Sequence, residues 1–150
     1  MFNSIEAANS MDNLITLCPG CHRMAEMNVR IRSAISGLKY ILYNLAPLQV
    51  MCDENDLGAY ADPAADFAAR QPVILLYDAI PAGMGLTQTL YKDHKHLLLN
   101  AQELILHCSC QDGCPSCVGP VAESGVGGKK ETKFLLELIL GDKLADGLSF

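Results

Sequence analysis

The sequence lacks any apolar run near the roughly 18 residues that a membrane span needs, and its first residues lack the basic and then apolar order of a secretory signal. It also lacks a basic excess, because 11 lysines and arginines stand against 17 aspartates and glutamates and give a net charge of −6. A protein whose whole surface attracts nucleic acid needs the opposite balance, so we expect any contact with DNA to be local. We therefore expect a soluble, cytoplasmic protein that does not bind a membrane.

The composition is that of a single folded domain. A chain of 150 residues with 50% hydrophobic side chains can bury one core of ordinary size. A regular helical pattern of apolar residues begins at residue 29. We therefore divide the chain into an N-terminal segment, residues 1–28, and a main domain, residues 29–150.

Four of the seven cysteines lie within ten residues, in the order Cys-x-Cys-x3-Cys-x2-Cys: Cys108, Cys110, Cys114 and Cys117. Zinc takes four thiolate sulfurs at about 2.3 Å in a tetrahedron, and short Cys-x2-Cys loops with turn-forming residues can curl round such a point. Gly113 and Pro115 supply these bends, and Gly119 can take the positive φ that turns N–H groups toward sulfur. We predict that the four cysteines hold one zinc ion.

Two other uses of these cysteines stay open at the level of sequence. Disulfides are disfavoured because the total of seven is odd, no secretory signal is present, and intracellular thiols stay reduced. An iron–sulfur cluster is the closer alternative, although the spacing fits neither of the standard ferredoxin patterns. A zinc ion with four thiolate ligands carries a formal charge of about −2, which nearby cations should offset. Three lysines follow the loop and could do this, or they could simply be solvated residues of the last helix: Lys129, Lys130 and Lys133.

A second cysteine pair, in Cys18-Pro-Gly-Cys21-His22, has turn-forming residues between its thiols. Cys-x2-Cys-His is also the attachment pattern of haem c, but haem c is attached outside the cytoplasm and the sequence shows no export signal. A second zinc site is the stronger alternative, completed by Cys52, by a histidine or by part of a longer chain. A structural turn with reduced thiols is slightly favoured over such a site.

The remaining pattern predicts an α/β fold, in which a small central sheet is covered by helices and the zinc loop lies near the C-terminal end. Strands are expected at residues 48–52 and 72–77, with 72–77 central and residues 13–17 as a candidate third strand. Helices are expected where apolar residues recur every three or four positions: 29–45, 86–106 and 131–144. Pro47 is expected to end the first helix.

Some details of these helices also follow from the pattern. The polar residues 92–96 lie either on the exposed side of the second helix or at a break in it, and residues 121–128 form a linker. The last helix is expected to bury its apolar residues: Phe134, Leu135, Leu138 and Ile139. Basic residues near the first helix could lie along phosphates, although a solvated surface is favoured: Arg23, Arg30, Arg32 and Lys39.

Two polar stretches have a ligand-binding interpretation beside a structural one. Carboxylates gather in residues 53–66, but their spacing is not that of a calcium loop, so turn-forming and capping roles are favoured. The turn after strand 72–77 carries Asp78, Gly83 and Gly85, where helix N–H groups could receive a phosphate. The third glycine of the dinucleotide fingerprint and the lysine of a P-loop are absent, so a tight turn needed for packing is favoured.

Three stretches stand in a characteristic order: Leu45-Ala-Pro-Leu48 leading to Cys52-Asp-x2-Asp56-Leu-Gly, then Tyr77-Asp78-x2-Pro81-x-Gly83-x-Gly85-Leu86, then Cys108-x-Cys-x2-Gly113-Cys-Pro-x-Cys117-Val-Gly-Pro120. Together they resemble the zinc-binding domain at the C-terminal end of mitomycin-repair-factor-type DEAD/DEAH-box helicases of superfamily 2. The resemblance covers roughly residues 30–145, and its cysteine run with Gly-Cys-Pro is specific. The first two stretches carry weight only in this order.

The resemblance implies that the four clustered cysteines ligate one structural zinc in an accessory domain of a helicase that translocates along DNA in repair. Helicase core domains of the same or a longer chain are then its partners, while DNA contact and a homo-oligomer stay open. The sequence has no Gly-x4-Gly-Lys-Ser/Thr, no Asp-Glu-x-His and no arginine-finger segment, so this chain alone is not expected to hydrolyse ATP. The alternative is a free-standing enzyme that binds a nucleotide or another ligand at Asp78, Gly83 and Gly85. The Cys18 pair lies outside the resemblance.

Overall fold

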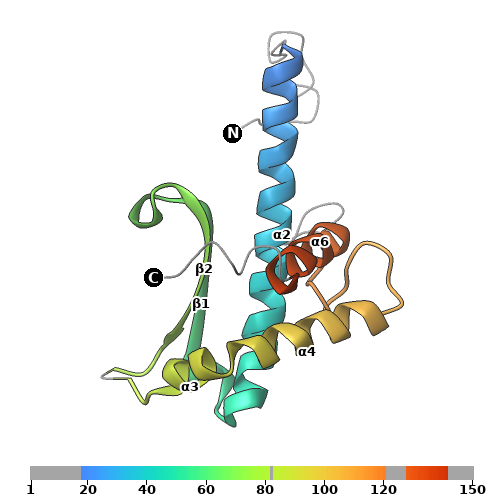
Figure 1. Ribbon diagram of the computed structural model, residues 1–150. Helices are drawn as coiled ribbons and strands as arrows, with labels where there is room; N and C mark the ends of the chain where they lie inside the picture. The colour runs from blue at the N-terminus through green and yellow to red at the C-terminus, as the bar shows by residue number, and fades with distance from the viewer. Residues whose placement is uncertain (1–17, 82, 121–127, 142–150) are drawn as a thin grey trace, which may run out of the picture.

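The computed structural model describes residues 18–81, 83–120 and 128–141, and within them it has four α-helices and one two-stranded sheet. The helices and strands are, in chain order, α2 (Pro19–Val50), β1 (Leu57–Ala65), β2 (Gln71–Asp78), α3 (Leu86–Lys92), α4 (His94–His107) and α6 (Gly128–Leu140). Figure 1 shows α2 as the long axis, with the hairpin on one side and α4 and α6 packed across it. Helix α2 contacts both strands and the three other helices. The predicted α/β fold, a small sheet with helices and a C-terminal cysteine loop, is confirmed.

Helix α2 starts ten residues before the predicted helix 29–45, because its N-terminus is set by a cap and not by an apolar pattern. Cys18 is the N-cap, and its sulfur accepts the N–H of Cys21 at 3.3 Å. Pro19 takes the first helical position, where an N–H would have no helical partner in any case. The first turns, as far as Arg30, are exposed, so periodicity appears only where the helix reaches the core.

The prediction that Pro47 ends this helix and that a strand follows at 48–52 is wrong. Pro47 lacks only its own N–H, and its carbonyl accepts the N–H of Met51, the left-handed C-cap, and that of Cys52 at 3.1 Å. Ala46 and Pro47 are both buried inside the last turns of α2. We infer that this burial outweighs the loss of one helical hydrogen bond.

Strands β1 and β2 form an antiparallel hairpin in which Leu57 pairs with Asp78. The predicted strand 72–77 is confirmed as part of β2. Among the described residues β2 pairs only with β1, so its predicted central position stays a prediction. Leu75 and Tyr77 are 45% and 46% exposed, so the continuous apolar run does not reflect cover on both faces.

The predicted helix 86–106 is two helices, because the chain breaks at Asp93, which ends α3 and precedes α4. The polar residues 92–96 therefore mark a break, which is one of the two predicted alternatives. Gly85, with a φ of 78°, forms the N-cap of α3 as the glycine-rich turn suggested. Four apolar residues of the two helices reach the core, at the spacing of three or four that predicted the helix: Leu90, Leu97, Ala101 and Ile105.

Helix α6 packs against α2 through a face that the sequence analysis did not choose. Thr132 and Leu136 are fully buried, and the hydroxyl of Thr132 donates to the carbonyl of Ala34 at 3.3 Å. A Cβ on Gly37 of α2 would collide with this hydroxyl, so a glycine is what lets the two helices approach. Three of the four apolar residues that were predicted to be buried are 43% to 55% exposed, so the prediction is wrong for them: Phe134, Leu138 and Ile139. The fourth, Leu135, is half-buried.

Two predictions are not decided by the described ranges. The candidate strand at 13–17 and residues 121–127 of the linker lie outside them, whereas Gly128 already belongs to α6. The division at residues 28 and 29 stays a prediction, with α2 continuous across it. Within the described ranges, no helix combines the length and the apolar character that a membrane crossing requires.

Candidate metal centre

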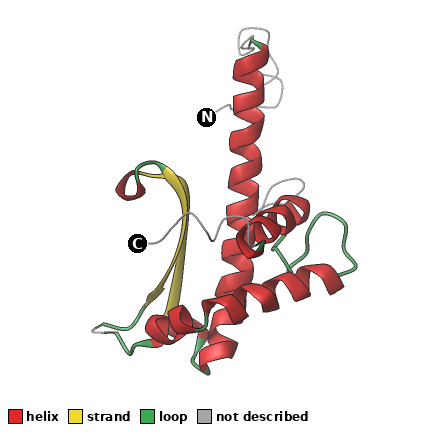
Figure 2. Ribbon diagram, viewed as in Figure 1, coloured by secondary structure: helices red, strands yellow, loops and turns green. Residues whose placement is uncertain are grey.

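The candidate metal centre is the loop that follows α4, residues 108–120, drawn in green in Figure 2. Helix α4 ends at His107, and Cys108 is its C-cap in an extended conformation, so the first sulfur follows the helix directly. The Cys114–Cys117 arm is a tight turn, in which the N–H groups of Cys117 and Gly119 donate to the carbonyl of Cys114 at 2.9 and 3.1 Å. Gly119 has the predicted positive φ, at 86°.

The structure brings the four predicted cysteine sulfurs together. All four Sγ atoms lie within 4.8 Å of one another. Four of the pairs are 3.4 to 3.5 Å apart: Cys108–Cys110, Cys108–Cys114, Cys110–Cys117 and Cys114–Cys117. Sulfurs bound at about 2.3 Å to a tetrahedral zinc would be about 3.8 Å apart, whereas a disulfide needs about 2.05 Å. The separations therefore suit a shared metal ion better than disulfides, and all four cysteines are free.

The four thiols differ in how readily they lose a proton. Hydrogen bonding with the backbone and the side chain of Cys110 lowers the pKa of Cys108 to about 7. Burial raises the pKa of Cys110, and it raises the pKa of Cys117 to about 12. A metal cation favours the thiolate form of any sulfur that it binds. A cation at this centre would thus offset the cost of ionising the buried thiols.

One lysine closes the centre from α6. The ammonium Nζ of Lys129 donates to the carbonyls of Cys108 and Cys110, both at 2.6 Å. Its positive charge lowers the pKa of Cys110, against the larger effect of burial. The structure thus brings Lys129, one of the three candidate counter-charges, to the loop. Lys130 is exposed, and the ammonium group of Lys133 lies 3.8 Å from the carboxylate of Glu137.

An aromatic residue of α2 holds the other side of the loop. The hydroxyl of Tyr40 donates to the carbonyl of Pro115 at 2.8 Å. Its ring lies against Gly119, where a Cβ would stand 3.0 Å from the ring. Cys117 and Val118 are 2% and 0% exposed beneath this contact. Sequence reasoning missed Tyr40, because no local signal connects it with a loop 75 residues later.

A family model for the MrfA Zn-binding domain matches residues 38–118, which is more than half of the chain and includes all four cysteines. The chain belongs to the MrfA Zn-binding domain family. The resemblance predicted from the three sequence stretches is therefore confirmed.

Similar proteins include a helicase of which the match covers a small part and a second protein of which it covers most. The ATP-dependent helicase YprA of Bacillus subtilis strain 168 is 35% identical over 107 residues, which are 71% of this chain and 14% of YprA. Protein MJ1572.1 of Methanocaldococcus jannaschii is 28% identical over 84 residues, which are 55% of this chain and 75% of that protein.

Two crystal structures of the DUF1998 helicase MrfA, one bound to DNA and one to DNA and AMPPNP, share the fold. Their TM-scores are 0.65 and 0.59, at 34% and 32% identity. They cover 73% and 76% of this chain and 14% of each helicase chain. The chain therefore spans a small part of the helicases that it matches.

The second cysteine pair of this MrfA Zn-binding domain protein lies away from the metal centre. Its predicted turn is the first turn of α2, where the Sγ atoms of Cys18 and Cys21 are 3.2 Å apart and exposed. The N–H of Cys21 lowers the pKa of Cys18. The imidazole Nδ1 of His22 faces Glu26 at 3.2 Å. Among the described residues, the pair belongs to no group of three or more ligands that could hold a metal.

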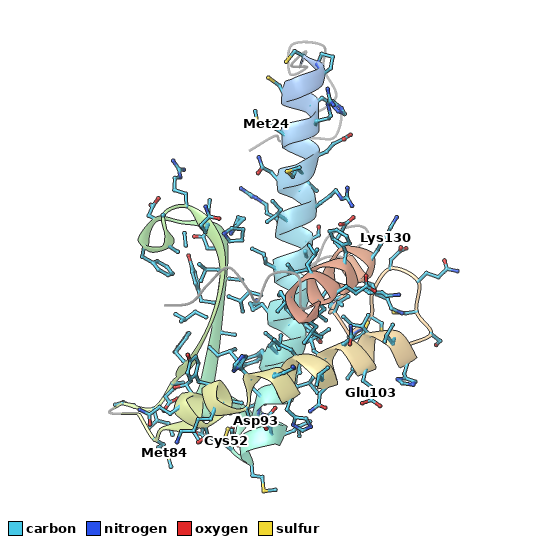
Figure 3. All side chains as sticks on the ribbon, in the orientation of Figure 1. Met24, Cys52, Met84, Asp93, Glu103 and Lys130 are labelled. Carbon is cyan, nitrogen blue, oxygen red and sulfur yellow. The ribbon has the colours of Figure 1, made fainter. Side chains whose placement is uncertain are left out.

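Cys52 cannot complete that pair within one chain. Figure 3 shows Cys52 at the opposite end of α2 from Met24, and a helix of 32 residues is about 48 Å long. Cys52 instead packs against the core, where burial raises its pKa and the carboxylates of Asp56 and Asp53 raise it further.

The turn at Asp78 is built as a helix cap. The carboxylate of Asp78 accepts four N–H groups at the start of α3, at 2.8 to 3.3 Å: those of Met84, Gly85, Leu86 and Thr87. The N–H of Thr87 contributes most to lowering the pKa of Asp78 to about 2. The donors that a phosphate would need are thus already occupied. The interpretation as a tight structural turn is the one that this geometry supports.

Other polar candidates also have local structural partners. Asp53 caps the 3-10 turn Glu54–Asp56 by accepting the N–H of Asn55 at 2.9 Å, which confirms its capping role. Much of the acidic stretch 53–66 is strand β1 and not turn. Three exposed histidines face nearby oxygen atoms and lie outside the cysteine group: His94, His96 and His107.

Proposed function

We propose that the chain is a non-catalytic zinc-binding domain of an ATP-dependent helicase that acts on DNA in repair. Its four loop cysteines would hold one structural zinc ion: Cys108, Cys110, Cys114 and Cys117. The observation that carries this proposal is the convergence of their four sulfurs within 4.8 Å of one another.

The chemistry of the four ligands favours zinc. Soft thiolate sulfur in a tetrahedral set is the environment of zinc or of iron–sulfur centres. An iron–sulfur cluster places several metal atoms between its cysteines and so needs them farther apart than a single ion does. The pairs at 3.4 to 3.5 Å fit one ion.

A structural role for the ion follows from its coordination and from its position. Four thiolates leave no open position for a substrate or an activated water, which a catalytic zinc keeps. The loop is attached to α4 at Cys108, to α2 through Tyr40 and to α6 through Lys129. An ion bound there would fix three helices that are far apart in the sequence.

The helicase assignment rests on the relatives. YprA is named an ATP-dependent helicase and MrfA is seen bound to DNA, and this chain corresponds to 14% of each. Because the sequence lacks ATPase motifs, helicase core domains would hydrolyse ATP and would be the partner of this domain. A cytoplasmic location, where thiols stay reduced, suits the free cysteines.

Replacing Cys114 and Cys117 by serine tests the zinc site. We expect the double variant to lose close to one zinc ion per chain and to melt at a clearly lower temperature, because the remaining thiols cannot form a tetrahedral set. Zinc is measured by elemental analysis and stability by thermal unfolding.

Cys52→Ser is the matched control, since Cys52 is a free and half-buried cysteine outside the group. It should keep the loop zinc. An unchanged metal content and melting temperature in the Cys114 and Cys117 variant would contradict the proposal.

A further inference from the structure

The first part of α2 stands apart from the rest of the domain and begins with a pair of thiols. Every residue from Cys18 to Arg30 is exposed, and Figure 1 shows this part of the helix projecting beyond the hairpin and α6. At its tip the sulfurs of Cys18 and Cys21 are 3.2 Å apart, close to the separations in the loop. The N–H of Cys21 lies 3.3 Å from the sulfur of Cys18, the same distance as in the loop turn at Cys114.

No other cysteine of this chain can complete the pair. Two thiolates supply half of a tetrahedral zinc site. Of the seven cysteines, four form the loop and Cys52 lies beyond the far end of α2. The loop is also distant, because Gly37, which lies against Val118 of the loop, is 19 residues along α2 from Cys18, or about 28 Å.

The histidines do not complete the pair either. His22 points at Glu26 and not at the two sulfurs. His96 and His107 line a cavity together with Leu48, which lies in the last turn of α2, at the far end from Cys18. His94 lies two residues before His96, in the first turn of α4. No cysteine or histidine of these 150 residues therefore completes a four-ligand site at Cys18 and Cys21, so further ligands of these two kinds would come from another chain.

The surface next to the pair has the character of a protein contact. Met24 and Met27 are 65% and 63% exposed, and Met27 leads into an apolar groove of about 510 Å³ between α2 and α6. The first turns of α2 are exposed, so packing against a partner would stabilise them. Arg23, whose Nε donates to the carbonyl of Pro19 at 3.4 Å, holds a positive charge at the tip.

We propose that Cys18 and Cys21 form half of a second zinc site and that a second copy of this chain supplies the other half. A second copy brings a thiol pair with the same spacing, and the projecting tips can meet without contact between the two cores. Each thiol releases its proton to solvent as its sulfur binds zinc. The two Arg23 side chains of the pair would offset the formal charge of about −2.

Zinc content and mass of the same sample test this proposal. The purified chain is kept with a phosphine reductant, loaded with zinc and freed of excess metal. We expect about 1.5 zinc ions per chain and a dimer, because one ion is held by each loop and one is shared. A weak chelator should separate the dimer while the loop ion stays bound.

Substitution of Cys18 and Cys21 by serine should give a monomer with about 1.0 zinc ion per chain. Cys52→Ser, as the matched control, should keep the dimer and the higher zinc content. The proposal is overturned if the wild-type chain holds only one zinc, if it holds two as a monomer, or if dimerisation does not depend on zinc. None of these results would affect the loop site, so the two proposals fail separately.

Discussion

Among single residues, Lys129 has the most direct link between the metal centre and the fold. Its ammonium group lies 2.6 Å from two carbonyl oxygens of the cysteine loop, and its own backbone lies in the first turn of α6. One side chain therefore sets the path of the loop and places a positive charge beside sulfurs that would be anionic around zinc. Groups outside the ligand set that orient or neutralise ligands change metal affinity strongly.

We predict that Lys129→Met weakens zinc binding roughly tenfold, because the loop loses two hydrogen bonds and its counter-charge. The measurement is competition for zinc with a coloured chelator. Lys130→Met is the matched control, because Lys130 is the next residue of α6 and is exposed. Equal affinities for the two variants would show that Lys129 has no special role.

Among the secondary structure elements, α3 is capped by a side chain from another element, β2, and not by its own N-cap residue. The N-cap Gly85 has no side chain, and Asp78 at the end of β2 supplies the carboxylate in its place. The hairpin and the helical part of the domain are thus joined by one acidic side chain. The pKa of Asp78 lies at about 2, below its ordinary value of 3.8, because the carboxylate accepts N–H groups of α3.

A depressed pKa makes this contribution dependent on pH in one direction. The carboxylate stabilises the fold above its ordinary pKa, and the contribution is lost as the pH falls toward 2. We predict that Asp78→Asn melts several degrees lower at neutral pH and that the difference from the wild type narrows as the pH falls through this range. Thermal unfolding of both proteins across the acid range measures this, and acid loss of zinc affects both alike. A difference that stays constant with pH would rule out the carboxylate as the cause.

Elements with local signals could be predicted from the sequence, and those fixed by distant contacts could not. The β2 run, the break near Asp93 and the four loop cysteines are each encoded within about ten residues. The continuation of α2 through Pro47 depends on burial against the core, which no window around Pro47 contains. The buried face of α6 depends on Gly37 of α2, about 95 residues away in sequence, because only a close helix contact buries Thr132 in place of larger apolar residues.

In the described part of the molecule, α2 contacts both strands and the three other α-helices, and the cysteine loop joins α2, α4 and α6. The four cysteines of the candidate site could be picked out in advance because their short spacing is visible in the sequence. The supports of that site, Tyr40 and the clamp by Lys129 on the backbone, are three-dimensional and needed the structure. A bound ion would thus act on the arrangement of the entire domain, which is why its identity is central.

X-ray absorption at the zinc edge tests this central claim most directly. The Cys18→Ser/Cys21→Ser variant is the suitable sample, because only the loop can then contribute a four-thiolate site. We predict one zinc per chain with four sulfur neighbours at about 2.3 Å and no nitrogen or oxygen neighbour. An iron edge in place of zinc, or a shell that includes nitrogen or oxygen, would contradict a closed structural zinc site at these four cysteines.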